Sequence, residues 1–214
     1  MTEQLALDLP VRPAFGRSNF WVAPCNQEAI AWIDKYPDWP MHALLIYGES
    51  GSGKTHLAAI FSDKRVEADA LTEDFMPDEE KIVVENVEKL HNEKALFHLF
   101  NRVHEMGGGL LMTAQKVPNF QLPDLQSRIG MTPKAEIQMP DEQTIISVCA
   151  KMFLDKQAIV EPSVLTYIAT HVARSFDAVR KVVNMADELS LAKGRPITIY
   201  VIKEALEKLS EQGG

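Results

Sequence analysis

The chain has 214 residues, of which 46% are hydrophobic and 24% are charged. This composition is typical of a folded protein of one or two domains, and it excludes a chain that is disordered over most of its length. The net charge of −8 gives no sign of the basic face with which proteins bind DNA phosphates, so no direct sequence-specific DNA binding is expected.

In the first part of the chain, predicted helices alternate with buried strands. An extended arm is expected at residues 1–14, and a helix at 27–35 should end before Pro37 and Pro40. Buried strands are then expected at 42–47, 81–85, 107–115 and 134–139, with helices at 54–62 and 92–105. Strands that alternate with helices predict an α/β fold, in which a parallel sheet carries helices on both faces.

From about residue 141 the pattern changes to helices alone. Asp141 is expected to cap the first of them. Further amphipathic helices are expected at 162–172, 175–193 and 198–209, and the apolar run 197–200 is the one strand-like signal in this part. The predicted domains are therefore an arm at 1–14, a nucleotide-binding α/β domain at 15–140 and a small helical lid domain at 141–214.

Residues 48–55, GESGSGKT, match the phosphate-binding loop G-x-x-x-x-G-K-[ST] between a predicted strand and a predicted helix. In such a loop the backbone N–H groups converge on phosphate oxygens, the lysine (Lys54) reaches the β/γ-phosphates and the hydroxyl of Thr55 binds Mg²⁺. The alternative is a glycine turn that matches by chance. The residues expected to bind nucleotide here are Gly48, Glu49, Ser50, Gly51, Ser52, Gly53, Lys54, Thr55 and His56.

The strand after this loop, in KIVVENVEKL, ends in Glu85 and Asn86 rather than in two acids. A glutamate can still hold a water on magnesium, although its carboxylate lies ~1.5 Å further out than that of an aspartate. The amide of Asn86 has no useful basicity with which to polarise an attacking water. Alternatively these residues only end the strand, and another acid such as Glu88 does the work. The sequence predicts a site that binds nucleotide well and turns it over slowly.

Five segments occur in an order that resembles the AAA+ proteins related to the bacterial replication initiator DnaA. They are SNFWVAPCNQEA, GESGSGKTHL, KALFHLFNRVHEMGGGLLMTA, LPDLQSRIG and SFDAVRKVVNMADEL, and the resemblance covers roughly residues 15–210. It implies a P-loop AAA+ fold that binds ADP or ATP with Mg²⁺. The chain is expected to lack the long N-terminal part and the helix-turn-helix domain of the initiator. In this short form it resembles regulators of the Hda type, which inactivate DnaA.

The resemblance also implies roles for residues outside the loop. Thr113 matches a polar residue that senses the γ-phosphate, unless it only ends a strand. Arg180 matches the second sensor, unless it is a solvated helix arginine. Four residues fall where the family lines the adenine pocket, with ordinary core packing as the alternative: Phe20, Trp21, Val22 and Asn26.

Arg128, in LQSRIG, matches the arginine that AAA+ proteins present to the nucleotide of a neighbouring subunit. Such an arginine finger neutralises charge on the transferring phosphoryl group and is worth about 10³–10⁵ in rate. The alternative is a surface arginine near the C-terminus of a helix.

The arm contains QLALDLP, residues 4–10. In isolation its alternation suggests an edge strand. In the context of the family it resembles the short peptide with which replication proteins bind the sliding clamp, where spaced leucines are anchors. Gln4 would set the register, and Leu5, Leu7 and Leu9 would enter the pocket.

These features predict a negative regulator of DNA replication initiation, which binds nucleotide and the sliding clamp and stimulates ATP hydrolysis by DnaA. Arg128 would act in trans, and the chain would have weak or no ATPase of its own. The alternatives are an independent AAA+ ATPase, such as a helicase loader or DnaA-like remodeller, and a scaffold that nucleotide merely stabilises. The short acidic segment 63–80 departs from the initiator, so surfaces built there need not transfer.

The remaining expectations concern compartment and assembly. The two cysteines, Cys25 and Cys149, lack the spacing of a metal site and predict reduced thiols in a cytoplasmic protein. No apolar run reaches the ~20 residues that cross a bilayer, and no signal sequence is expected, so no membrane partner is predicted. The sequence leaves open whether the chain forms a homo-oligomer.

Overall fold

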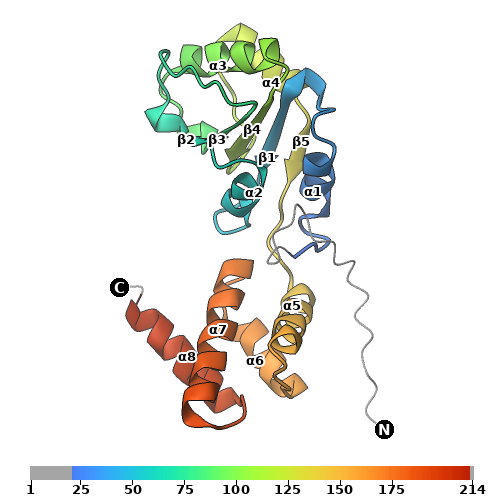
Figure 1. Ribbon diagram of the computed structural model, residues 1–214, viewed down its shortest axis with the longest axis vertical. Coiled ribbons are helices and arrows are strands. Elements are labelled where there is room, and N and C mark those ends of the chain that lie inside the picture. The colour runs from blue at the N-terminus through green and yellow to red at the C-terminus, as the bar shows by residue number, and fades with distance from the viewer. Residues whose placement is uncertain (1–20, 213–214) are drawn as a thin grey trace. The chain divides into compact units, whose positions relative to one another are not determined.

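The computed structural model describes residues 21–212 (Figure 1). The chain divides into two compact units, with the division between Gln138 and Met139. None of the helices in the described part combines the length and the apolar character needed to cross a bilayer. The predicted clamp-binding residues and one predicted adenine-pocket residue lie outside the described residues: Gln4, Leu5, Leu7, Leu9 and Phe20.

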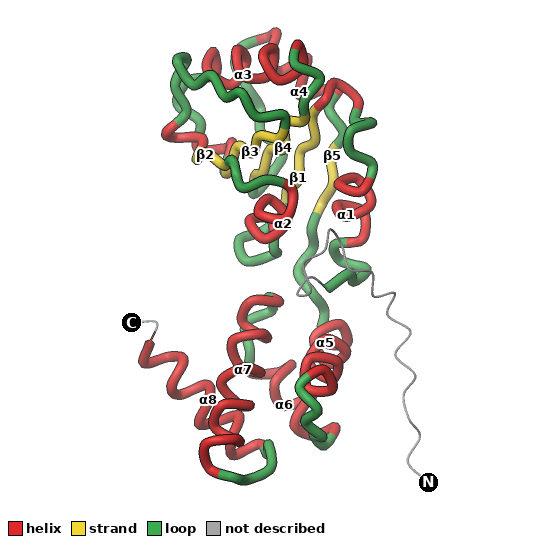
Figure 2. Tube along the Cα trace, in the orientation of Figure 1, coloured by secondary structure: helices red, strands yellow, loops and turns green. Residues whose placement is uncertain are grey.

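The first unit is built on a five-stranded parallel sheet in the order β2-β3-β4-β1-β5 (Figures 1 and 2). Its strands are β1 (Ala43–Tyr47), β2 (Arg65–Glu67), β3 (Lys81–Glu85), β4 (Gly109–Ala114) and β5 (Lys134–Glu136). Its helices are α1 (Gln27–Asp34), α2 (Lys54–Phe61), α3 (Glu93–Glu105) and α4 (Pro123–Met131), with the 3-10 turns η2 (Pro40–His42), η3 (Ala68–Ala70) and η4 (Val87–Lys89). The predicted α/β fold class is confirmed.

Successive side chains of each central strand enter two different cores. In β1, Leu44 and Ile46 pack with α1 and α2, whereas Ala43 and Leu45 pack with α3 and α4 on the other face. All four side chains are fully buried. Because both faces of a parallel sheet are covered, its strands read as continuous apolar runs rather than as an alternation, which is why the sequence located them.

The second unit is helical and consists of α5 (Glu142–Asp155), α6 (Pro162–His171), α7 (Phe176–Lys193) and α8 (Ile199–Gln212). Helix α7 packs against both α5 and α8. Asp141 caps α5 as predicted, because its carboxylate accepts a hydrogen bond from the backbone N–H of Thr144 at 2.7 Å.

Two elements were not predicted, and the one strand-like signal of the second unit does not form a strand. Strand β2 contains a single apolar residue and α4 is only nine residues long, so neither produces a long periodic signal. The strand-like run 197–200 instead leads into α8, which agrees with the helix predicted at 198–209, and its apolar pattern continues in Val201, Ile202 and Ala205, which are buried on that helix. The β-branched residues there favour a strand locally, but packing on the unit's core decides for a helix.

Candidate nucleotide-binding site

The predicted phosphate loop lies between the carboxyl end of β1 and the start of α2, in the middle of the sheet. The backbone of Gly48 approaches that of Ile137 closely, because a Cβ at residue 48 would lie 2.2 Å from the Ile137 carbonyl oxygen. Gly53, the N-cap of α2, has φ +108°, a conformation that other residues rarely adopt. The loop therefore depends on glycine at both ends for its shape.

Lys54 is the first residue of α2, and its side chain points back into the loop. Its Nζ donates hydrogen bonds to the carbonyl oxygens of Gly48 at 2.7 Å and Glu49 at 2.8 Å. The residue is only 7% exposed, and burial lowers the pKa of Lys54, an effect that the negative charge of Glu88 partly offsets. The loop thus encloses a cation whose carbonyl contacts a phosphate oxygen could replace.

Ser52 and Thr55 differ in how their hydroxyls are placed. Ser52 is 1% exposed, and its Oγ has no hydrogen-bond partner among the described residues. An unpaired buried hydroxyl costs about 1–3 kcal/mol, so this orphaned group fits a bound phosphate that would satisfy it. Thr55 lies one residue into α2 and is exposed, and His56 follows it, partly buried. The loop backbone and these side chains fit a nucleotide phosphate.

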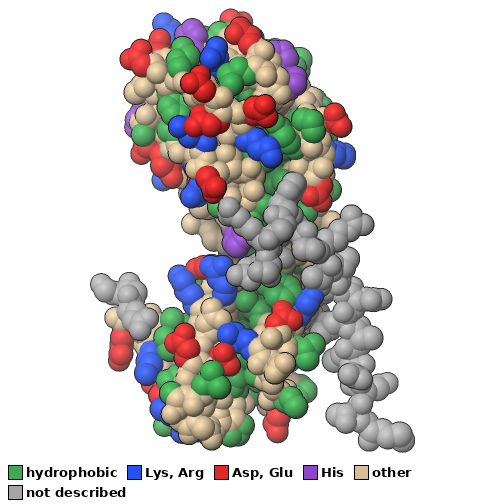
Figure 3. Space-filling view, viewed as in Figure 1, with side chains coloured by type: hydrophobic (Ala, Val, Ile, Leu, Met, Phe, Trp, Pro, Cys, Tyr) green, Lys and Arg blue, Asp and Glu red, His purple; other side chains and the backbone are tan. Residues whose placement is uncertain are grey.

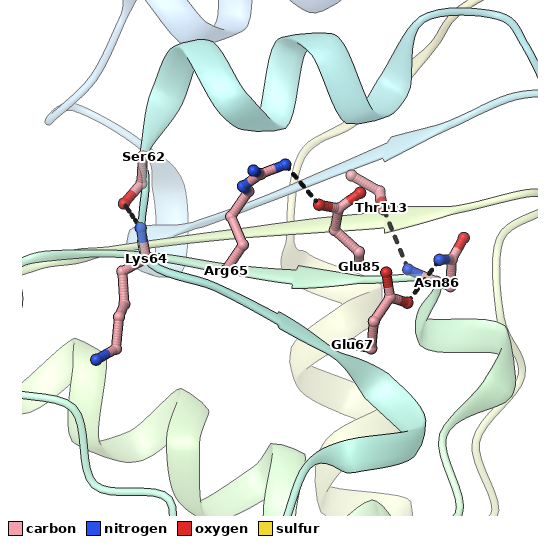
Figure 4. A network of polar contacts seen from close by, with 7 residues as sticks. All are labelled: Ser62, Lys64, Arg65, Glu67, Glu85, Asn86 and Thr113. Carbon is pink, nitrogen blue, oxygen red and sulfur yellow. Dashed lines mark hydrogen bonds and ion pairs between the residues drawn. The ribbon is translucent and has the colours of Figure 1, made fainter.

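The carboxyl end of β3 carries the acid that the sequence singled out. Glu85 is 5% exposed, and its Oε1 lies 3.2 Å from Nη1 of Arg65, on the neighbouring strand β2 (Figure 4). Asn86 has left-handed backbone angles, and its N–H donates to Oγ1 of Thr113 at 3.1 Å. Its side chain donates to Oε2 of Glu67 at 2.8 Å. The structure brings Glu85, Asn86 and Thr113 together. It also adds Arg65 and Glu67, which were not predicted as site residues.

Magnesium is the metal that a phosphate loop implies. The described residues contain no group of three or more His, Cys, Asp or Glu that could hold a metal ion, so Mg²⁺ would depend on phosphate oxygens and the Thr55 hydroxyl. That hydroxyl fits, because it is exposed at the start of α2. The Glu85 carboxylate does not fit as it stands, because a guanidinium already occupies one of its oxygens.

The predicted adenine-pocket residues form a turn before α1. The side chain of Asn26 donates to the Trp21 carbonyl at 2.8 Å and accepts from the Ala23 N–H at 2.8 Å. Asn26 is buried, so its amide is satisfied within the turn itself. Val22 packs, partly buried, against the core that α1 and α2 share. The turn therefore has a structural role, and its contact with adenine stays a prediction.

Arg128 lies on α4, whose buried residues Leu125 and Ile129 pack on the sheet face opposite to α2. Its guanidinium carbon is 5.1 Å from the ring centroid of Phe97 and 5.5 Å from that of Phe100, both on α3. Within residues 21–212 no carboxylate pairs with it. The structure does not bring this arginine to the phosphate loop of its own chain.

Arg180 belongs to the other unit. On α7 its Nη2 lies 2.5 Å from Oδ1 of Asp177, which also pairs with Lys181 at 2.8 Å. Hydrogen bonds from Lys181 and Arg180, the first being the stronger, lower the pKa of Asp177. Arg180 therefore has a partner within its own helix.

On the face shown in Figure 3, acidic and basic side chains are mixed over both units.

No family model matches the chain. Over 95% of its length it is 24% identical to the chromosomal replication initiator protein DnaA of Cutibacterium acnes, and over 95% it is 27% identical to DnaA of a Synechococcus species. It spans about half the length of these initiators, 48% and 52% respectively.

Solved structures show the same fold. Domain III of DnaA from Thermotoga maritima aligns with 93% of this chain and 98% of its own length, with a TM-score of 0.67 and 23% identity. AMPPCP-bound DnaA from Aquifex aeolicus covers 94% of this chain and 71% of its own, with a TM-score of 0.69 and 15% identity. A mutant of Thermotoga maritima RuvB covers 78% of this chain and 62% of its own, with a TM-score of 0.63 and 14% identity. The chain is thus similar to DnaA along nearly its whole length, and it has the AAA+ fold of DnaA domain III.

Proposed function

We propose that this chain is a nucleotide-binding negative regulator of replication initiation, of the Hda type, which stimulates ATP hydrolysis by DnaA. The AAA+ fold and the similarity to DnaA support a protein that acts in replication initiation. The observation that carries the proposal is the position of Arg128. Its guanidinium contacts the ring of Phe97, pairs with no described carboxylate, and belongs to α4, which packs on the sheet face opposite to α2.

The phosphate loop binds ADP or ATP in this proposal. Lys54 contacts the terminal phosphates, and Thr55 is the protein ligand of Mg²⁺, which neutralises phosphate charge when bound. Glu85 and Thr113 face the same nucleotide, and Trp21, Val22 and Asn26 contact the base. Arg180 keeps its predicted role as the second sensor. Because Asn86 has no carboxylate with which to activate water, turnover by the chain itself is slow.

DnaA supplies the ATP on which Arg128 acts. An arginine finger provided in trans stabilises the charge of the transition state and is worth about 10³–10⁵ in rate. A cation held on an aromatic ring keeps its full charge and loses little side-chain freedom when it meets a phosphate. The regulator therefore needs no catalytic acid of its own.

The arm brings the regulator to DNA through the sliding clamp. Gln4, Leu5, Leu7 and Leu9 enter the clamp pocket as an extended peptide. Replacing Gln4 and Leu7 together by alanine should abolish capture by immobilised clamp and leave ADP affinity unchanged. Capture that survives this double substitution would remove the arm from the proposal.

The decisive experiment adds the chain to ATP-loaded DnaA, with and without clamp on DNA, and measures ADP formation. The wild-type chain should accelerate hydrolysis, and Arg128→Ala should abolish the acceleration while retaining nucleotide binding. Arg102→Ala is a matched control, because Arg102 lies on α3 of the same unit and its guanidinium forms a surface ion pair with Asp78 at 3.6 Å. Acceleration that Arg128→Ala leaves unchanged would favour a scaffold.

An independent AAA+ ATPase is the second candidate, and the complete loop with its buried Lys54 favours it. Such an enzyme would hydrolyse ATP steadily in the absence of DnaA, and Lys54→Ala would abolish that activity. The purified chain on its own therefore discriminates between the two functions.

A further inference from the structure

The ion pair between Arg65 and Glu85 lies on the face of the sheet that α2 covers. Strand β2 pairs with β3 so that Arg65 is opposite Val83 and Glu67 is opposite Glu85. Residues opposite each other in a parallel pair, and residues two apart in one strand, point to the same face. Val83 belongs to the core that Leu57 of α2 also enters. Figure 4 accordingly shows the side chains of Arg65 and Glu85 pointing toward one another.

The two side chains of this ion pair are buried to different extents. The side chain of Glu85 is 7% exposed and that of Arg65 is 38% exposed. A buried carboxylate is stable only with a partner, and removing that partner leaves an uncompensated charge. The second polar side chain at this strand end, that of Asn86, is neutral and donates to Glu67, while the backbone N–H of Asn86 donates to Thr113. Arg65 is thus the cation that neutralises Glu85.

We propose that Arg65 is a positioning residue that holds Glu85 away from magnesium, so that this chain binds nucleotide nearly independently of Mg²⁺. The inference rests on the proposed nucleotide site and concerns how that site is tuned. A carboxylate paired with a guanidinium attracts a second cation weakly, because its charge is already neutralised and the guanidinium repels the metal. The same pairing reduces repulsion between Glu85 and the diphosphate, which favours nucleotide even when no metal is present.

Removing Arg65 should reverse both effects. In Arg65→Ala, the unpaired Glu85 repels ADP in EDTA and supports the metal when Mg²⁺ is added. For the wild-type chain, the Kd for ADP in EDTA should be no more than about three times the Kd in Mg²⁺. In Arg65→Ala this ratio should be at least about fivefold higher than in the wild type, because a partly exposed ion pair of about 1 kcal/mol corresponds to that factor. The measurement is calorimetric titration of the full chain with ADP.

Three further variants isolate the charge from the fold. Arg65→Lys keeps the cation and should keep the wild-type ratio, whereas Arg65→Gln keeps a polar, unbranched side chain without the charge and should behave like Arg65→Ala. In a Glu85→Gln background, Arg65→Ala should leave the ratio unchanged, since no carboxylate remains to be released. Lys64→Ala is the matched control, because Lys64 precedes Arg65 and pairs with Glu79 on the surface at 3.0 Å.

The outcomes separate this inference from the proposed function. An equal ratio for Arg65→Ala, Arg65→Gln and wild type, in variants whose thermal unfolding is cooperative, would overturn the role of Arg65 and leave stimulation of DnaA untouched. A raised ratio in a chain that fails to stimulate DnaA would support Arg65 and overturn the regulator. If the wild-type chain binds ADP in neither buffer, the nucleotide site and the inference both fall.

Discussion

Gly48→Ala tests whether the phosphate loop has the geometry described above. The added Cβ would lie 2.2 Å from the backbone oxygen of Ile137, whereas real Cβ contacts stay beyond 3.0 Å. The obstacle is backbone rather than the end of a flexible side chain, so either the loop or the segment after β5 must move. Overpacking of this kind costs about 1–3 kcal/mol, and a loss of 2 kcal/mol corresponds to a fall of at least about 4 °C in the unfolding midpoint.

The same substitution should weaken nucleotide binding, because the carbonyl of Gly48 holds the ammonium of Lys54. Thermal unfolding and ADP titration measure the two effects on one sample. Gly130→Ala is the control: it lies on α4 with no atom near its added Cβ, and alanine in a helix gains about 0.5–1 kcal/mol over glycine. A midpoint for Gly48→Ala within 1 °C of wild type (below the shift expected for even 1 kcal/mol) would refute the geometry.

Three other predictions concern separate parts of the molecule. Phe97→Leu removes the aromatic face under Arg128 and keeps an apolar side chain, so stimulation of ATP hydrolysis by DnaA should fall about 2- to 5-fold. Phe97→Tyr keeps the ring and should stimulate as the wild type does. An undiminished rate in the leucine variant would contradict the contact. Hydrogen bonds from Thr144, through its side chain and then its backbone, lower the pKa of Asp141 below its ordinary 3.8, so Asp141→Ala should cost about 1 kcal/mol at pH 7 in urea unfolding. That difference should shrink as the pH falls below 3.8 and the carboxylate is protonated, and a constant difference would exclude the cap. Burial raises the pKa of Cys149 to about 12, so iodoacetamide at pH 8 should leave Cys149 unmodified in the folded chain by mass spectrometry, and rapid labelling would show that the second unit opens.

The central strands and the long helices could be predicted because each carries its signal locally. Strand β3 is an uninterrupted apolar run, and α3 repeats apolar residues at helical spacing. Strand β2 has no such signal, since Arg65 and Glu67 flank one apolar residue and pairing with β3 makes the segment a strand. Helix α4 did carry one: a proline at its first turn and an apolar pair four residues apart, Leu125 and Ile129.

Some residues of the candidate site could likewise be predicted from the sequence, and others could not. The loop at residues 48–55 is a local motif, so its residues follow from spacing alone. The ion pair between Arg65 and Glu85 joins residues twenty positions apart and depends on the register of β2 against β3. Sequence reasoning treated the segment that contains Arg65 as an acidic surface, because the acids there outnumber the basic residues and local composition says nothing of strand pairing.

The charged groups of the proposed mechanism lie on two different faces of the sheet. Lys54 and Glu85 lie on the face that α2 covers, whereas Arg128 lies on α4, which packs on the other face. The covered sheet lies between α4, where Arg128 contacts Phe97 and Phe100 of α3, and α2, which follows the phosphate loop. The proposed function accordingly assigns Arg128 to a nucleotide that is bound to another chain. Arg65 differs, because it pairs with Glu85 at the carboxyl end of β3, beside the nucleotide site proposed for its own chain. Arg65→Ala should therefore change the Mg²⁺ dependence of ADP binding, and Arg128→Ala should change the stimulation of ATP hydrolysis by DnaA. A single substitution that altered both measurements would show that the two faces of the sheet are coupled.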